Sequence, residues 1–200
     1  MNCVQKSISP CIETLKVIDA HVMHLTWHQA RFDTTRKELF GDSSCKILSK
    51  YLDPPKNGTY RIRITYADEI MNVEYLPYIS RTIERFSLVE TRIDYAYKYA
   101  NRDALNALIP SFADDVIFTC KNELMDTSIA NIALLCNGVW LTPKHPLLKG
   151  TTRARLLASG FLKEAVLNKE SLQNASKFAI MNALIGFKII ENRLIEGLER

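Results

Sequence analysis

The chain has 200 residues, of which 47% are hydrophobic and 24% charged, a composition typical of globular proteins and not of fibrous or disordered ones. No apolar run is long enough to cross a bilayer, so a transmembrane protein is excluded. The formal net charge is only +4, and the 26 basic residues are interspersed with 22 acidic ones, which argues against a nucleic-acid partner.

The N-terminal ten residues contain no basic segment followed by an apolar stretch and a cleavage site, so we expect a cytoplasmic protein. The slight positive charge suits a small anionic ligand. The five cysteines are widely spaced, without a CxxC pair or a neighbouring histidine at metal-ligand spacing. We therefore expect buried thiols and no metal site at Cys3, Cys11, Cys45, Cys120 and Cys136.

The periodicity changes between strand-like alternation and helical spacing, which predicts a mixed α and β fold. Strands are expected over residues 11–18 and 22–26, followed by a helix over residues 27–40 that Gly41 ends. A second short helix is expected over residues 44–52, before Pro54 and Pro55.

Residues 59–66 alternate strictly between polar and apolar side chains, which predicts a strand with Arg61 and Arg63 on one face and Ile62 and Ile64 on the other. Two neighbouring arginines could hold a carboxylate, or they could form the solvent-facing side of an antiparallel sheet. The next strand is expected over residues 71–78. The pattern restarts near residue 81, which predicts a small α+β domain over 1–80 and a larger domain over 81–200.

The second half is expected to contain strands over residues 86–90, 116–119, 131–135 and 139–141 and a helix over residues 102–108. Asn137-Gly138 joins the last two of these strands, and Asn-Gly between apolar runs is a strong hairpin signal. A loop over residues 142–150 should lead into a helix over residues 151–159, with strand, helix and strand following.

Four blocks of residues stand out in order along the chain: His28-Gln29-Ala30-Arg31-Phe32, Lys98-Tyr99-Ala100-Asn101-Arg102, Asp126-Thr127-Ser128-Ile129-Ala130-Asn131 and Leu148-Lys149-Gly150-Thr151-Thr152-Arg153. Alone, each has an ordinary interpretation as a solvated arginine, a surface lysine, a turn or a helix cap. Together they resemble the class IV aminotransferase and aminodeoxychorismate lyase family, with matching order across nearly the whole chain.

The resemblance implies a compact, two-domain fold-type IV enzyme, similar to D-amino acid aminotransferase, that uses pyridoxal 5'-phosphate (PLP). In this family the lysine of the second block carries the cofactor, which would be Lys98. The carboxylate of the third block faces the pyridine nitrogen, and Asp126 stands where relatives usually have glutamate. The resemblance places the cofactor phosphate against Arg31, Thr151, Thr152 and, by a weaker match in Met181-Asn182-Ala183-Leu184, Asn182.

These residue types suit the roles that the resemblance gives them. A planar guanidinium binds phosphate oxygens as a fork, and a glycine followed by two threonines at a helix start presents N–H groups and the positive end of the helix dipole to an anion. A carboxylate at the ring nitrogen keeps it protonated, so that the ring accepts electrons. Tyr95, Tyr97 and Tyr99 would give the Lys98 amine a semi-apolar setting, which favours its neutral form. The segment Cys11-Ile12-Glu13-Thr14 stands where the family lines its substrate pocket.

The predicted reaction is the conversion of 4-amino-4-deoxychorismate to 4-aminobenzoate and pyruvate in folate biosynthesis, because the second block follows the lyase pattern more closely than the branched-chain aminotransferase pattern. The alternatives are a class IV aminotransferase acting on branched-chain or D-amino acids and a binding protein that has lost the chemistry. Arg61, Arg63 and Arg102 are candidates for contacts with carboxylates of a small anionic amine substrate. The resemblance also implies a homodimer, with aminodeoxychorismate synthase as a functional partner.

Overall fold

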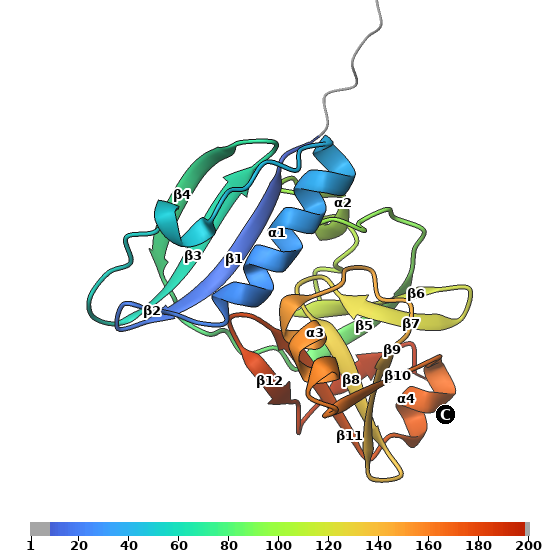
Figure 1. The fold of residues 1–200 in the computed structure, drawn as a ribbon. Helices are drawn as coiled ribbons and strands as arrows, with labels where there is room; N and C mark the ends of the chain where they lie inside the picture. Colours follow the sequence, from blue (N-terminus) through green and yellow to red (C-terminus); the bar gives the residue numbers. More distant parts are fainter. Residues whose placement is uncertain (1–8, 199–200) are drawn as a thin grey trace, which may run out of the picture. The chain divides into compact units, whose positions relative to one another are not determined.

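The computed structural model describes residues 9–198, which divide into two compact units (Figure 1). The first unit runs to Tyr78 and also includes the short segment Tyr97–Asn101, and the second contains Ile79–Ala96 and the chain from Arg102 onward. Within residues 9–198, none of the helices is long and apolar enough to span a membrane.

The first unit is a four-stranded antiparallel sheet with a long helix packed on it. Its strands follow the order β2-β1-β3-β4, and its helices are α1 and the short 3-10 helix η1. The bounds are β1 Cys11–Ile18, β2 His21–Val22, α1 Leu25–Phe40, η1 Leu48–Tyr51, β3 Thr59–Tyr66 and β4 Ile70–Pro77. The predictions of β1 and β3 are confirmed at both ends.

Alternation explains why α1 packs on this sheet. Leu15 and Val17 of β1 and Ile62 and Ile64 of β3 face one side and are fully buried, together with Phe32 of α1. The adjacent residues of β3, Arg61 and Arg63 among them, are only half-buried on the other face. The predicted division of β3 into an apolar and a polar face is therefore confirmed.

Two predictions for the first unit are wrong. The strand expected over residues 22–26 has only its first residue in β2, because the backbone turns at His24 (φ 54°) and α1 begins at Leu25. The helix expected over residues 44–52 is limited to η1. The buried guanidinium of Arg36 donates to the Ser44 carbonyl and to the Asp42 carboxylate, and these contacts hold residues 42–44 against the end of α1 in a non-helical conformation.

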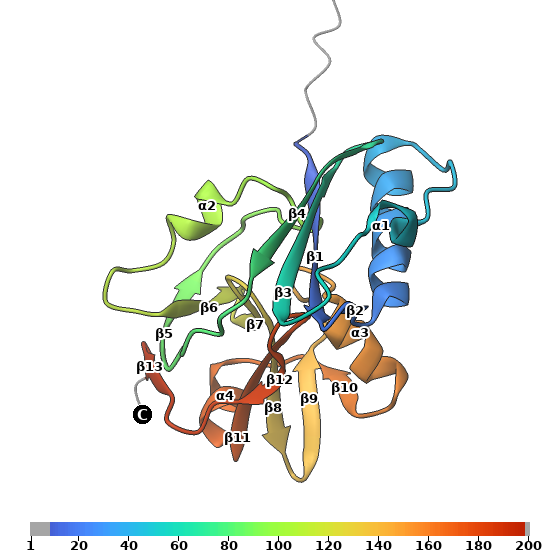
Figure 2. The same ribbon diagram turned by 90° about the vertical axis from the view of Figure 1, so that its left-hand side faces the viewer.

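The second unit is built on a nine-stranded mixed sheet (Figure 2). Its strands follow the order β10-β9-β8-β7-β6-β5-β13, and β11 pairs with β8 and with β12. The bounds are β5 Arg85–Glu90, α2 Asp103–Asn106, β6 Asp115–Cys120, β7 Glu123–Thr127, β8 Asn131–Cys136, β9 Val139–Pro143, α3 Thr151–Ala158, β10 Leu162–Ala165, α4 Lys169–Asn174, β11 Lys177–Asn182, β12 Gly186–Ile189 and β13 Leu194–Glu196.

The β8–β9 hairpin confirms the Asn137-Gly138 prediction, since both residues have the positive φ angles that such a two-residue turn requires (50° and 76°). The sequence analysis missed β7. The turn before it has the same geometry, but Lys121 and Asn122 adopt it (φ 49° and 67°) without a glycine to signal it.

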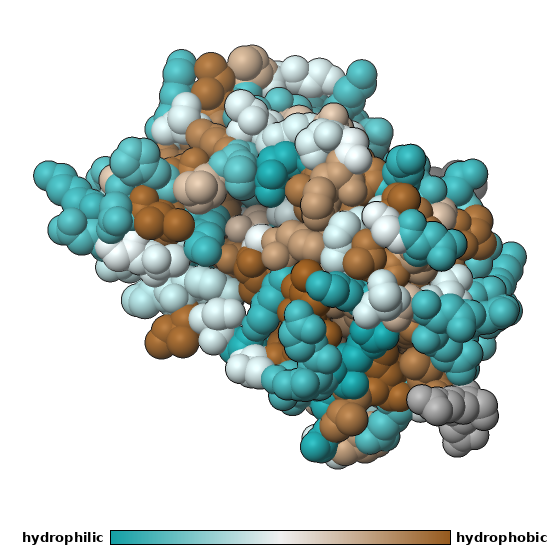
Figure 3. Space-filling model, turned by 90° about the horizontal axis from the view of Figure 1, so that it is seen from below, coloured by the Kyte–Doolittle hydropathy of each residue, from teal (hydrophilic) through white to brown (hydrophobic). Residues whose placement is uncertain are grey.

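The surface mixes polar and apolar residues, and the burial of the cysteines agrees only partly with the prediction. On the face drawn in Figure 3, hydrophilic and hydrophobic residues are mixed in small groups. Cys11 is buried as expected, Cys120 and Cys136 are half-buried, and Cys45 is exposed, which makes the prediction of buried thiols wrong for Cys45. Cys3 lies outside the described residues.

Candidate active site

Glu13 is the centre of a buried polar cluster in the first unit. It points inward from β1 with Cys11 and Leu15, and none of the three side chains is exposed to solvent. Arg31 of α1 donates from Nε to Glu13 Oε1 at 2.8 Å and from Nη2 to Oε2 at 2.7 Å. The Nδ1 atom of His28, one helical turn earlier, lies 2.6 Å from Oε2. The guanidinium predicted to bind phosphate is thus oriented by a carboxylate beneath it.

Charge keeps Glu13 ionised despite its burial. Removal from water by itself would raise the pKa of Glu13, but the charge of Arg31 and the hydrogen bonds from His28 and Arg31 outweigh it and hold the pKa at about 2. The cluster also affects its neighbour, because burial and the negative charge of Glu13 raise the pKa of the Cys11 thiol to about 12. Cys11 is therefore an unreactive thiol.

Lys98 lies in the first unit, on a segment that runs beside the start of β1. Its carbonyl accepts a hydrogen bond from Ile12 N at 2.8 Å, and Tyr99 forms an antiparallel bridge with Cys11. The Lys98 side chain is half-buried. Tyr97 and Tyr99, on either side of it, pack edge to face with ring centroids 6.2 Å apart. The backbone of Lys98 is therefore fixed next to the strand that carries Glu13.

Asp126 of β7 is a buried carboxylate of the second unit. It stands opposite Asn131 of β8, whose side-chain amide donates to Asp126 Oδ1 at 2.8 Å. The other oxygen, Oδ2, accepts a hydrogen bond from Leu148 N at 2.9 Å. The Leu148 carbonyl in turn accepts one from the Asn131 side-chain amide at 2.8 Å. Three hydrogen bonds thus connect Asp126, Asn131 and the loop that precedes α3 to one another.

The environment of Asp126 disfavours its negative charge. Burial raises the pKa of Asp126 to about 7, although the hydrogen bonds from Asn131 and Leu148 and the charge of Arg153 act in the opposite direction. The two hydrogen-bond donors are neutral, in contrast with the arginine that pairs with Glu13. A cationic group placed against Asp126 would be strongly favoured, because it would stabilise the ionised form.

Gly150 brings the start of α3 into close contact with this network. A Cβ atom at Gly150 would lie 2.0 Å from Asn131 Oδ1, although the backbone conformation (φ −71°) is one that any residue can adopt. The position is thus restricted to glycine by the close approach of the Asn131 side chain.

Thr151 and Thr152 open α3 and are both buried. The first intrahelical hydrogen bond runs from Ala154 N to the Gly150 carbonyl, so the N–H groups of the first turn lie at the positive end of the helix. Arg153 anchors this end from behind, donating to the Pro143 carbonyl at 2.8 Å and to Glu164 at 2.7 Å. The arrangement suits an anion.

Asn182 and Arg102, two further candidates, both bind the turn between Asp126 and Asn131. Asn182 donates to the Ile129 carbonyl at 3.2 Å and accepts from the N–H groups of Leu184 and Ile185. Arg102 donates from Nη2 to the Ser128 carbonyl at 2.6 Å. Their predicted contacts with phosphate and substrate stay predictions.

In the first unit, Arg61 and Arg63 lie side by side on the half-buried face of β3, where Arg63 is in register with Glu74 of β4. Their predicted contact with substrate also stays a prediction.

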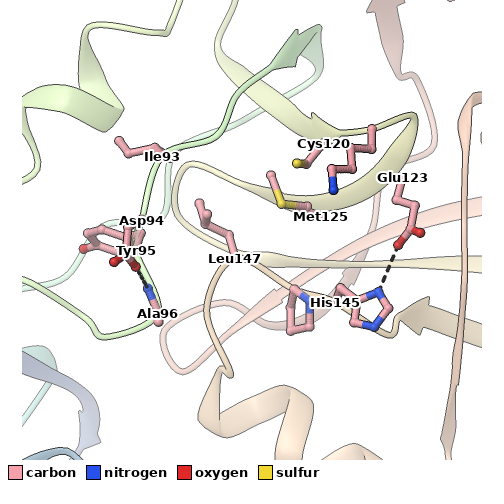
Figure 4. A pocket seen from close by; sticks show the side chains of 11 residues that line it. Ile93, Asp94, Tyr95, Ala96, Cys120, Glu123, Met125, His145 and Leu147 are labelled. Atoms are coloured by element: carbon pink, nitrogen blue, oxygen red, sulfur yellow. Dashed lines mark hydrogen bonds and ion pairs between the residues drawn. The ribbon is translucent and has the colours of Figure 1, made fainter. Parts of the chain in front are cut away.

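A pocket of about 410 Å³ lies in the second unit, between the β6–β7 hairpin, the segment after β5 and the loop after β9 (Figure 4). Met125 and Leu147 project into it, and a His145–Glu123 hydrogen bond of 2.9 Å lies at its side. Successive residues of a strand face opposite sides, so Met125 lines the pocket while Asp126 points away from it. None of the predicted cofactor residues lines this pocket.

Comparison with known proteins supplies the family. Residues 95–192 match the model of the amino-transferase class IV family. This part of the chain belongs to the family. Its members are PLP-dependent enzymes that include class IV aminotransferases and aminodeoxychorismate lyases, and the predicted fold-type IV architecture is confirmed.

Two relatives and one solved structure illustrate what this chain is similar to. An uncharacterised Haemophilus influenzae protein is 29% identical over 185 residues, covering 88% of this chain and 98% of its own. A proposed aminodeoxychorismate lyase of Schizosaccharomyces pombe is 29% identical over 126 residues, covering 57% of this chain and 54% of its own. The crystal structure of a proposed 4-amino-4-deoxychorismate lyase from Haemophilus somnus 129PT has a TM-score of 0.80 and 26% identity, covering 89% of this chain and 97% of that one.

Glu13, Asn131 and Gly150 are structural parts of the candidate site that the sequence analysis quoted within motifs without giving any of them an individual role. Asn131 and Gly150 belong to the blocks quoted above. Their positions, Asn131 five residues after Asp126 and Gly150 directly before Thr151, were the sequence signal for their place in the site. Glu13 belongs to the segment that the resemblance placed at the substrate pocket. Its charge at an inward position of a predicted strand was a second signal, since charged residues are rarely buried without a partner.

The pKa of Asp126 predicts a pH-dependent stability in the protein without cofactor. The pKa is about 7 in the folded state against an ordinary value of 3.8, so the folded state holds an extra proton between these values and stability falls as pH rises from about 4 to about 7. Asp126→Asn has no ionisable group at this position, so its stability should not fall in this way as pH rises. Urea denaturation should show the stability of the variant relative to wild type increasing over that range, and a pH-independent difference would contradict the assignment.

Removal of Glu13 should leave Arg31 and His28 without their buried acceptor. Because breaking a buried ion pair leaves an uncompensated charge, we expect Glu13→Ala to lower the free energy of unfolding by about 3 kcal/mol or more at pH 7. Glu69→Ala, which breaks the surface pair with Lys46, is the control and should cost less than about 1 kcal/mol. Equal losses in the two variants would show that the Glu13 cluster contributes no more than a surface pair.

Gly150→Ala should displace Asn131, because the new methyl group and Asn131 Oδ1 cannot occupy the same space. We expect a loss of about 1–3 kcal/mol in stability, typical of an overpacked site. The double variant Gly150→Ala/Asn131→Ala should lose less than the sum of the two single variants. Additive losses in denaturation experiments would mean that the two positions do not interact.

Proposed function

We propose that this chain binds PLP and converts 4-amino-4-deoxychorismate to 4-aminobenzoate and pyruvate. The observation that carries the proposal is the linked pair of Asp126 and the start of α3. Leu148, three residues before α3 begins, binds Asp126 through its N–H and Asn131 through its carbonyl. A carboxylate and an anion-binding helix end are thereby held at a fixed separation, as the ring nitrogen and the phosphate of one small molecule require.

The donor set fits PLP. Asp126 would face the pyridine nitrogen. A protonated nitrogen there would be a cation beside the carboxylate and would stabilise its ionised form, which burial disfavours. The first turn of α3, with the Thr152 hydroxyl, would hold the phosphate. Arg31, whose guanidinium is oriented by its hydrogen bonds to Glu13, would contribute a positive charge to the phosphate. Lys98 would carry the cofactor covalently.

When bound, PLP would supply an electron sink for the negative charge that develops at the amine-bearing carbon of the substrate. The protein supplies the proton transfers. The Lys98 amine would take the proton from that carbon, and Asp126 would keep the ring nitrogen protonated. In the substrate, the bond between the ring carbon and the enolpyruvyl oxygen breaks and the ring becomes aromatic. The released enolpyruvate takes up one proton to become pyruvate.

The substrate carries two carboxylates, and we propose that Arg61 and Arg63 bind one of them. The two guanidinium groups occupy neighbouring positions on one face of β3 and are only half-buried, so a ligand can approach them. A lysine would be a weaker substitute, because it lacks the planar fork.

Lys98→Ala should abolish the near-ultraviolet to visible absorbance band that PLP acquires when it is bound to a lysine. The purified wild-type protein, supplemented with PLP, should show the band. Lys163→Ala, a change at an exposed lysine of β10, is the matched control and should keep it. A wild-type protein without such a band would overturn the proposal, and so would a Lys98→Ala variant that keeps it.

Aminotransferase activity is the second candidate function, because the matched family model is named for it. Wild-type protein should release equimolar 4-aminobenzoate and pyruvate from 4-amino-4-deoxychorismate and should not transfer an amino group from branched-chain or D-amino acids to a keto acid. Product in the second assay alone would replace the lyase by an aminotransferase.

We also propose that the enzyme is a cytoplasmic homodimer that receives its substrate from aminodeoxychorismate synthase. Sedimentation should give twice the 22.8 kDa mass of one chain. A monomer at micromolar concentration would contradict this part of the proposal and leave the chemistry untouched.

A further inference from the structure

The turn between β7 and β8 separates Asp126 from Asn131 and sets their pairing. Thr127 closes it from within, since its N–H donates to the Ala130 carbonyl at 2.8 Å and its hydroxyl accepts from Ala130 N at 3.0 Å. These contacts are local and are sufficient to form a tight turn.

A second set of contacts comes from outside the turn and converges on Ser128. Asp115, the first residue of β6, accepts the N–H of Ser128 on Oδ1 at 3.1 Å. Arg102, just before α2, donates from Nη2 to the carbonyl of the same residue at 2.6 Å. Two side chains of opposite charge therefore hold the two backbone groups of one residue, an arrangement that we call the Ser128 clamp.

The clamp carries an energetic cost. The Asp115 side chain is fully buried, and its second oxygen Oδ2 has no hydrogen-bond partner among residues 9–198. The same holds for Arg102 Nε and for the Ser128 hydroxyl. Burial of polar and charged groups without full pairing destabilises a protein. Since Thr127 already closes the turn, these costly groups must add something other than turn formation.

We propose that Arg102 and Asp115 are positioning residues, which fix the Asp126 carboxylate for the cofactor ring by clamping Ser128. The clamp acts through the chain, because Ser128 lies two residues from Asp126 and three from Asn131. The proposal replaces the substrate contact predicted for Arg102. It rests on the proposed function only in naming the cofactor, since the fixing of Asp126 is a property of the protein alone.

The first test uses the protein without cofactor. The pKa of Asp126, about 7, can be followed by 13C NMR of its carboxyl group during a pH titration. Opening the clamp should admit water to the carboxyl and lower this pKa by about one unit or more toward its ordinary value. We expect the decrease in Arg102→Met and Asp115→Ala. Asp115→Asn retains an acceptor oxygen and should keep the wild-type pKa.

Thr142→Val is the matched control for a general loss of stability. It removes a buried hydrogen bond from Thr142 to the Ile132 carbonyl, in the same sheet but outside the contacts that hold Ser128. It should lower the denaturation midpoint without changing the pKa of Asp126. If Arg102→Met and Asp115→Ala also leave that pKa unchanged, the proposal is overturned. Arg102→Met decides the question if Asp115→Ala does not fold.

The second test adds PLP and measures its dissociation constant by equilibrium dialysis. Arg102→Met and Asp115→Ala should bind PLP at least 10-fold more weakly than wild type, and Asp115→Asn and Thr142→Val should bind it as wild type does. Wild-type affinity in the first two variants would contradict the proposal. If wild-type protein itself does not bind PLP, the proposed function fails, while the pKa titration still tests the clamp.

Discussion

The second unit depends on the pair of hydrogen bonds that Leu148 makes, one to the Asp126 carboxylate and one from the Asn131 amide. Through them, a strand pair and a helix start become one rigid piece. The same pair explains why glycine stands at position 150, where the Asn131 side chain leaves no room for a Cβ atom. Without Asn131, the carboxylate and the helix end would each keep their local structure but lose their fixed separation.

Two of the buried carboxylates, Glu13 and Asp126, lie in opposite electrostatic environments. Glu13 is surrounded by Arg31 and His28, so its pKa stays at about 2 and it is a permanent anion that orients a cation. Asp126 receives hydrogen bonds from neutral donors, so burial raises its pKa to about 7. The first is suited to holding a guanidinium in place. The second is suited to meeting a cation that arrives from outside, and a protonated pyridine ring is such a cation.

Local patterns predicted the elements that local physics determines. Strict alternation predicted β3 at both ends, Gly41 the end of α1, and Asn137-Gly138 the β8–β9 turn. Prediction failed where a turn lacks a glycine to signal it and where contacts outside the segment decide. The Lys121-Asn122 turn hid β7, and the contacts of Arg36 prevented the helix expected over residues 44–52. The motif residues Lys98 and Asp126 could be named from their order along the chain. The partners Glu13 and Asp115 could not, because only folding brings residues 18 and 13 positions apart into contact.

The central claim is that Asp126 meets a protonated ring nitrogen, and 15N NMR of bound PLP labelled at that nitrogen tests it most directly. Wild-type protein should give the chemical shift of a protonated pyridine at pH 8. Asp126→Asn should move the signal to the position of an unprotonated ring. The same unprotonated shift in both proteins would contradict the account.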